Sequence, residues 1–314
     1  MDAICPSRRD FLRSVLAATT LAGCRSGAAP TPLRATATAP ALVGAGRDLA
    51  AAIAAARGAV DFVRAGDRVF VKVNLNSGQP FPYTTSAETA VALIELLRTH
   101  GAADILVGDR SFFGADTARN AATTGLAAAV RAAGAKWIVL DEHEPAFAWR
   151  HVRADDWDGG LRVPALYDDV DHVIHLATAK THFITHYTMT LKLAFGSVHA
   201  DDRRRNLSPH DTTDGRLWRQ IAQAAAAYRP ALHVLDARRP VITGGPDSGR
   251  TASHGALYAS ADPIALDVTG LAVLRTCRSP EPAVAGDPWA QPQLRAGIAA
   301  GLGITSATDY SLAV

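Results

Sequence analysis

Short apolar runs and amphipathic segments alternate along the chain from about residue 42 to its end. Apolar runs and alternating patterns predict strands at 68–74, 104–107, 136–140, 171–176, 232–236 and 256–260. Apolar residues at helical spacing predict helices at 47–57, 87–100, 118–133, 188–195, 216–227, 263–274 and 291–300. Strands that alternate with helices are typical of an α/β fold with a largely parallel sheet and flanking helices. The irregular stretch 142–170 is the expected boundary between two lobes around a cleft.

The first 24 residues carry three export signals in the order that lipoprotein precursors have. Arg8-Arg9 followed by Phe11-Leu12 resembles a twin-arginine motif. Residues 15–22 form an apolar segment that is too short to cross a bilayer as a permanent helix. Leu21-Ala22-Gly23-Cys24 resembles a lipobox, which predicts lipidation of Cys24. The alternative is a short amphipathic N-terminal helix that belongs to the fold.

The leader divides the chain into three predicted parts. These are a signal (1–24), a flexible Ala/Thr/Pro-rich tether (25–41) and an α/β domain (42–314). The twin-arginine translocase and the lipoprotein-processing machinery are the expected partners, and a lipid at the periplasmic face is the expected membrane attachment. Arg25 stands where an aspartate is typical of inner-membrane retention, which favours the outer membrane. The twin-arginine route carries folded proteins and is typical of proteins that take up a cofactor before export.

Composition argues against polyanionic partners and against an iron–sulfur cluster. The formal net charge of +2 is too small to indicate binding to nucleic acid or to an anionic membrane surface. The chain has three cysteines, two of them in the leader, so a four-cysteine iron–sulfur cluster is impossible. Any metal would therefore be held by His, Asp or Glu.

Lys72 and Asn74 end the first predicted strand, at a place where α/β folds bind ligands. A lysine in an apolar strand needs a partner or a ligand, because burying its charge alone is costly. Both residues are therefore candidates for cofactor binding. The alternative is a lysine on an edge strand that points to solvent.

The densest polar segment contains Lys180, His182, His186 and Lys192, with His210 further along the chain. If this segment is helical, His182 and His186 share one face, as a pair of metal ligands would. A solvated or hydrogen-bonded pair is the alternative. The two lysines repel a cation, so they favour an anionic substrate or a covalent cofactor over a plain zinc site.

Acidic residues follow later strands. Asp236 closes a strand and is a candidate for cofactor binding, while capping explains Asp262 before Pro263. Asp267 falls within the following helix and is a candidate catalytic residue. The run 203–205 of three arginines suits a phosphate or carboxylate, or else a solvated face.

Together these motifs resemble the family catalogued as domain of unknown function 362, over about residues 65–275. The residues that carry the resemblance are Lys72-Val73-Asn74-Leu75, Ala179-Lys180-Thr181-His182, Thr190-Leu191-Lys192 with Phe195-Gly196, His210, Asp236, Gly244-Gly245-Pro246 and Ala259-Ser260-Ala261-Asp262-Pro263. Some relatives carry ferredoxin-type clusters, a role that the cysteine count excludes here.

The order of His182, Lys192 and His210 also resembles the core of nickel-pincer lactate racemases. That resemblance implies that Lys192 carries a covalently attached nickel-pyridinium cofactor, His182 is an acid/base and His210 ligates nickel. This chain departs from that family at Thr190-Leu191, where the family has Gly-Gly, and it has no convincing counterpart of the second acid/base histidine.

Two function classes follow. One is an exported enzyme, of racemase, epimerase or redox type, that acts on a small anionic substrate with a metal or covalent cofactor. Its expected site residues are Lys72, Asn74, Lys180, His182, Lys192, Asp236 and Asp267, with His186 and His210 as metal ligands. The other is a non-catalytic lipoprotein that binds an anion or metal for uptake or sensing. A structural lipoprotein would not require three polar strand ends.

Overall fold

The computed structural model describes residues 3–4, 40–56, 60–112, 114–140, 148–206 and 214–314. Cys24, His210 and all but two residues of the predicted leader lie outside the described residues. Ala3 and Ile4 form β1 (Ala3–Ile4), which pairs in parallel with β11 (Ala252–Ser253). No helix in the described ranges has the length and apolar character needed to cross a membrane.

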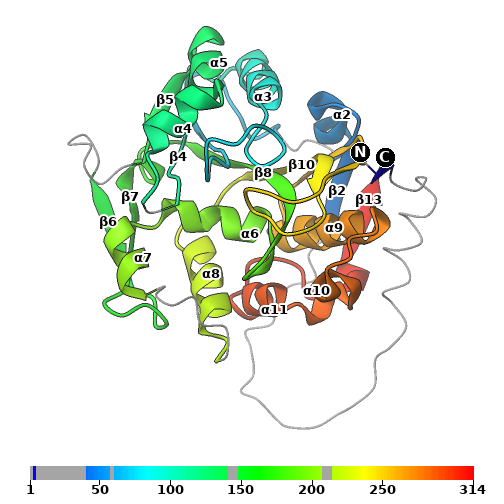
Figure 1. The fold of residues 1–314 in the computed structure, drawn as a ribbon. Coiled ribbons are helices and arrows are strands. Elements are labelled where there is room, and N and C mark those ends of the chain that lie inside the picture. Colours follow the sequence, from blue (N-terminus) through cyan, green and yellow to red (C-terminus); the bar gives the residue numbers. More distant parts are fainter. Residues whose placement is uncertain (1–2, 5–39, 57–59, 113, 141–147, 207–213) are drawn as a thin grey trace.

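A nine-stranded sheet crosses the described part of the molecule (Figure 1). Its strands lie in the order β13 (Tyr310–Ala313), β2 (Ala41–Gly46), β12 (Leu257–Ser260), β10 (Leu232–Val241), β8 (His172–His182), β3 (Arg68–Lys72), β4 (Asp104–Asp109) and β5 (Lys136–Val139), with β9 (His186–Thr188) paired to β8. β10, β8, β3, β4 and β5 are all parallel, whereas β12 is antiparallel to both of its neighbours. The prediction of a largely parallel α/β sheet is confirmed.

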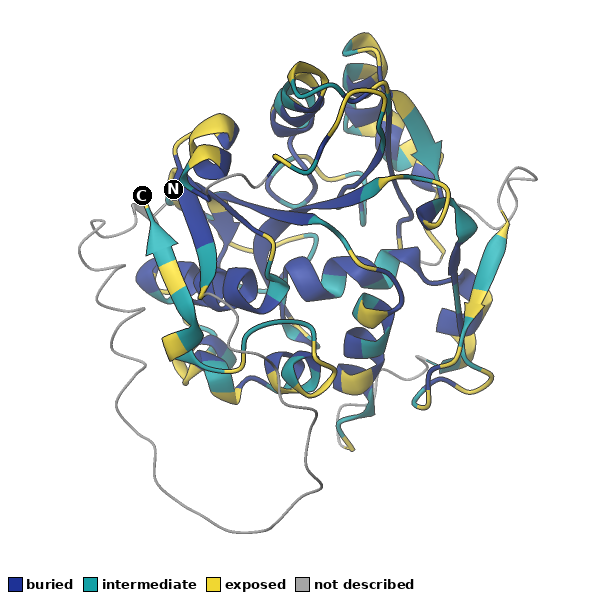
Figure 2. Cartoon of the chain, turned by 180° about the vertical axis from the view of Figure 1, so that it is seen from behind, coloured by how far each residue is buried: buried dark blue, intermediate teal, exposed yellow. Residues whose placement is uncertain are grey.

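Helices cover both faces of this sheet (Figure 1). One face carries α2 (Leu49–Ala55), α3 (Ala87–Thr99), α4 (Thr117–Thr123) and α5 (Leu126–Ala132), and the other carries α6 (Thr190–Leu193), α8 (Arg216–Ala226), α9 (Pro263–Thr276), α10 (Pro282–Ala285) and α11 (Pro292–Ala299). Beside the sheet lie α7 (Ala200–Asn206) and the hairpin β6 (Trp149–Val152)–β7 (Leu161–Pro164). The central strands are buried, and the exposed residues lie on the outer faces of the helices, on loops and on outlying strands (Figure 2). The apolar residues of the helices face the sheet.

The direction in which the chain adds parallel strands to the sheet reverses between β3 and β8. From β3 the chain builds outward to β4 and then β5, and it then returns to place β8 and β10 on the other side of β3. At such a switch point, neighbouring loops diverge to opposite faces and leave a crevice at the carboxyl ends of the strands. The topology therefore places a ligand site beyond the ends of β3 and β8.

Several boundaries differ from the predictions. The expected helix at 118–133 is two helices, because Gly125 adopts a left-handed conformation (φ 71°) between them. The residue at the end of the expected tether, Ala41, already belongs to β2. The division into two lobes at 142–170 is not confirmed, since strands before and after this stretch belong to one sheet. Asp262 caps α9 through Ala265 N–H, as expected.

Candidate functional site

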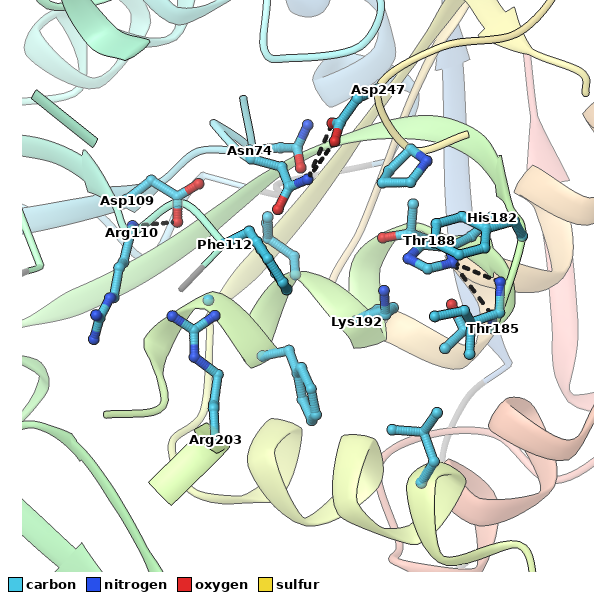
Figure 3. Close-up of a pocket in the computed structure, with 18 of the residues that line it drawn as sticks. Asn74, Asp109, Arg110, Phe112, His182, Thr185, Thr188, Lys192, Arg203 and Asp247 are labelled. Carbon is cyan, nitrogen blue, oxygen red and sulfur yellow. Dashed lines mark hydrogen bonds between the residues drawn. The ribbon is translucent and has the colours of Figure 1, made fainter. Parts of the chain in front are cut away.

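A cavity of about 380 Å³ lies at the carboxyl ends of β3, β4 and β8. Six charged side chains line this switch-point cavity: Lys72, Asp109, Arg110, Lys192, Arg203 and Asp247. His182, Asn74 and Phe112 line it as well (Figure 3). Four of the charged groups are basic and two are acidic, so the lining carries a surplus of positive charge.

Lys72 is buried and ion-paired. Its Nζ binds Asp109 Oδ1, and the other oxygen of that carboxylate accepts from Leu75 N–H at 2.5 Å. Burial lowers the pKa of Lys72, while Asp109 opposes this shift. The edge-strand alternative is wrong, because β3 lies between β8 and β4.

Gly196 allows the backbone to approach this ion pair. A Cβ added at Gly196 would lie 2.8 Å from Lys72 Nζ and 3.0 Å from Asp109 Oδ1. A side chain here would therefore displace the Lys72 amine and press on the Asp109 carboxylate, which favours glycine in the turn after α6.

Lys180 and Lys192 have different surroundings. Lys180 is fully buried and its Nζ donates to the Tyr83 carbonyl at 2.6 Å. Lys192 is half-buried in the cavity wall and makes no hydrogen bond or ion pair to another described residue. Burial lowers the pKa of Lys180 to about 8, and burial together with nearby Lys180 and Arg203 lowers the pKa of Lys192 to about 7.

His182 is oriented by the turn that follows β8. Its Nδ1 accepts from Ile184 N–H at 3.1 Å and Thr185 N–H at 3.3 Å (Figure 3). An acceptor nitrogen carries no proton, so the neutral ring bears its hydrogen on Nε2. His182 is therefore arranged to donate a hydrogen bond through Nε2, and this tautomer offers no lone pair at Nε2 to a metal.

The cavity wall is completed by residues far apart in the sequence. Arg203 on α7 is buried, and its Nη2 donates to the Ser111 carbonyl at 3.2 Å. Both carboxylate oxygens of Asp247 accept from Asn76 Nδ2 at 3.0 Å, which joins the 243–249 loop to the end of β3 (Figure 3).

The family described as a domain of unknown function (DUF362) matches residues 69–272. The chain belongs to this family. The DUF362 segment includes every lining residue of the cavity, from Lys72 to Asp247. The chain is also similar to a thylakoid-associated protein of Synechocystis sp., with 29% identity over 210 residues. That alignment covers 66% of this chain and 63% of the relative, so this DUF362 chain spans less than two thirds of the relative's length.

Four predicted site residues of this DUF362 protein do not line the cavity: Lys180, His186, Asp236 and Asp267. Asp236 binds Arg238 and Thr89, and it does not line the cavity. Asp267 accepts from two backbone N–H groups at the start of α6, so it also contacts the cavity only indirectly. The segment that contains His182 and His186 is not a helix, so the two histidines do not share a helix face. They pair across the antiparallel strands β8 and β9.

His186 packs on Trp218, with ring centroids 5.3 Å apart, and does not line the cavity. Among the described residues, no three His, Cys, Asp or Glu side chains lie close enough together to hold a metal ion. His210, the other expected metal ligand, lies outside the described residues.

The sequence patterns do not indicate Asp109, Arg110 or Asp247 as site residues. The first two directly follow the apolar part of β4, and a polar pair at the carboxyl end of a buried strand is a signal that could have found them. Asp247 reaches the cavity from a loop after β10, and only the fold brings it to Asn76.

Proposed function

We propose that this protein is an enzyme that binds a small organic anion in the switch-point cavity and acts on it with the Lys192 amine. The observation that carries the proposal is that Lys192 has no acidic partner among the described residues, although it lines the same cavity as Arg110 and Arg203. An anionic group suits a wall with a surplus of positive charge, and charge-assisted hydrogen bonds from arginine suit carboxylates and phosphates.

The site supports chemistry as well as binding. An amine with a pKa of about 7 exists in both protonation states at neutral pH, which is the condition for efficient proton transfer. His182 presents an N–H donor to the same cavity, where it would stabilise negative charge that develops on a substrate oxygen. A racemase or epimerase type of reaction on a small oxygenated acid fits these groups.

The cofactor implied by the racemase resemblance fits in part. Lys192 lines the cavity, but a covalently attached cofactor would use up the amine that the proposed proton transfer needs. His182 uses Nδ1 as an acceptor, and the third expected residue, His210, lies outside the described residues. If such a nickel-containing group were bound, it would supply a hydride acceptor, and Arg110 and Arg203 would hold the substrate anion.

Anion titration tests this proposal. Isothermal titration with lactate, malate, pyruvate and phosphate should reveal a ligand that binds the purified protein. The Arg203→Gln variant should bind it roughly 10- to 100-fold more weakly, since a hydrogen bond to a charged group contributes about 1.5–3 kcal/mol. Arg204→Gln is the matched control, because Arg204 lies on the same helix but is half exposed and paired with Asp201.

Exchange of hydrogen for deuterium at C2 of bound lactate or malate, or at C3 of bound pyruvate, is followed by NMR in heavy water and then separates two outcomes. Exchange that is lost in Lys192→Ala supports the enzyme. Binding without exchange of any bound anion supports the non-catalytic binding lipoprotein instead. Absence of binding across the panel contradicts both.

We also propose that the protein is exported through the twin-arginine route and held at the periplasmic face of a membrane by lipid on Cys24. The ordered motifs of residues 1–24 support this, and the thylakoid association of the Synechocystis relative agrees with a location at a membrane surface.

Fractionation of a Gram-negative host tests the export proposal. Arg8→Lys combined with Arg9→Lys should leave the protein in the cytoplasm, whereas Cys24→Ala should release it from the membrane. Arg13→Lys serves as the control for the arginine pair. A Cys24→Ala protein that stays in the membrane fraction would show that lipid on this residue is not the anchor.

A further inference from the structure

We propose that Lys192 is a nucleophile that forms a Schiff base with a small aldehyde or ketone bearing a carboxylate. The inference rests on the proposed binding of an organic anion in the same cavity, and it assigns both the covalent chemistry and the substrate class. It follows from the surroundings of the lysines, from the position of α6 and from the groups that face the amine.

The chain has four lysines, and three of them are already engaged. Lys72 pairs with Asp109, Lys180 donates to the Tyr83 carbonyl, and Lys136 pairs with Asp104 on the protein surface. Lys192 alone makes no such bond within the described part of the chain, and it faces the cavity. An amine that is not held by a carboxylate is available to attack a ligand.

The protonation state of Lys192 agrees with this role. Only the unprotonated amine is a nucleophile, and burial with the positive charges of Lys180 and Arg203 lowers its pKa to about 7, although Asp247 opposes this. The unprotonated amine is therefore present at neutral pH. A desolvated lysine beside a second cationic group is a known arrangement for Schiff-base chemistry.

The amine is also held in place. Asp267 accepts from Thr190 N–H at 2.8 Å and from Leu191 N–H at 3.3 Å, which fixes the first turn of α6 and with it the origin of the Lys192 side chain. In the view of Figure 3, Lys192 lies between Thr188 and His182 on one side and Phe112 and Arg203 on the other. A carboxylate at Arg203 would then leave its carbonyl group near the amine, with the His182 N–H as a donor to the carbonyl oxygen.

The step balances without an oxidant or reductant. The nitrogen lone pair of Lys192 bonds to the carbonyl carbon, and the carbon–oxygen double bond is replaced by a carbon–nitrogen double bond. Both hydrogens of the amine end on the oxygen, which leaves as water. Protonation of the resulting imine by solvent makes the neighbouring carbon more acidic, which agrees with proton-transfer chemistry in this cavity.

Reductive trapping tests the inference on the full protein. Glyoxylate or pyruvate is added with cyanoborohydride, and the adduct is located by peptide mass mapping. We expect one adduct on Lys192, with a trapping rate that rises with pH around a midpoint of about 7. Exposed Lys136, whose side chain is 65% exposed, reports non-specific labelling, and Lys136→Ala should leave the Lys192 adduct unchanged.

The Lys192→Arg variant separates this inference from the proposed function. It keeps the positive charge, so it should still bind pyruvate in a calorimetric titration while losing the adduct. Wild-type protein that binds pyruvate or glyoxylate but gives no adduct, or that is labelled on Lys136 at the same rate, overturns the Schiff base and leaves anion binding intact. Thermal unfolding of each variant confirms that it is folded.

Discussion

At the scale of single residues, the same side-chain type has different chemistry in different places. Lys72 and Lys180 lie on strands and Lys192 lies on α6. Lys72 is ion-paired, Lys180 is bound to a carbonyl, and Lys192 makes no bond to another described residue. The difference depends on which groups the fold places beside each amine. The charge state and contacts of each lysine are therefore decided by its neighbours and not by the residue type.

Two buried histidines form a second unusual feature. His175 and His233 line another cavity, of about 250 Å³, with their rings 5.0 Å apart. His175 Nε2 bonds to Tyr228 Oη at 2.9 Å, while Nδ1 of both rings has no hydrogen-bond partner among the described residues. Burial lowers the pKa of His175 well below its usual value and that of His233 to about 3. Both rings are therefore neutral in the folded protein at mild pH.

We expect these histidines to make the protein less stable in acid. Between pH 6.5 and about 3 the unfolded chain binds a proton on His233 that the folded protein does not, so stability is lost as the pH falls. The loss approaches about 1.4 kcal/mol per pH unit for one such residue. Urea unfolding at several pH values should show that the free energy of unfolding falls less between pH 6 and 4 in His233→Gln than in the wild type.

The exposed His151 supplies the control for this comparison. His151→Gln should keep the wild-type dependence of unfolding free energy on pH. If His233→Gln and the wild type lose stability equally between pH 6 and 4, the buried histidine is not the cause.

At the scale of elements, the short helix α6 carries Lys192 and depends on α9 for its position. A four-residue helix has little stability of its own. Asp267, which is buried in α9, accepts the N–H groups of Thr190 and Leu191 that would otherwise lack partners. Burial raises the pKa of Asp267 to about 7 against these hydrogen bonds. Asp267 is therefore a positioning residue for Lys192.

Asp267→Asn tests that role. The amide has a single acceptor oxygen, so one of the two N–H groups loses its partner, which costs about 1–3 kcal/mol of unfolding free energy. We expect slower reductive trapping at Lys192, measured by the same mass mapping. Asp158→Asn is the control, because it removes an exposed ion pair with Arg216 that contributes about 0–1 kcal/mol. Unchanged stability and trapping in Asp267→Asn would show that α6 does not need this carboxylate.

At the scale of the whole molecule, strand order creates the site. The cavity gathers residues from the ends of β3, β4 and β8, from α6 and α7, and from the 243–249 loop. These segments meet because the sheet reverses its order between β3 and β8. The family match of residues 69–272 contains all of them, whereas β2, β13 and α11 lie outside it. The segment shared with the family is therefore the part that builds the cavity.

The sequence by itself determined the fold class and part of the site. Apolar periodicity is a local property, so the central strands, most helices and the cap at Asp262 could be predicted. Lys72, Asn74 and His182 could be recognised as polar residues near strand ends, and Lys192 as part of the polar segment that continues into the next helix. The histidine pair shows the limit of this reasoning. Spacing alone could not tell a helix from the turn between β8 and β9, since both bring residues four apart together.

Only the tertiary structure decided which of these residues act together. Strand order and side-chain direction depend on contacts between distant segments, so nothing local indicated that Asp109 would neutralise Lys72 or that Asp267 would turn toward the backbone of α6. The pKa of Lys192 has the same origin, because burial and neighbouring charges exist only in the folded chain. Local pattern supplies the functional groups, and packing decides which of them remains free to react.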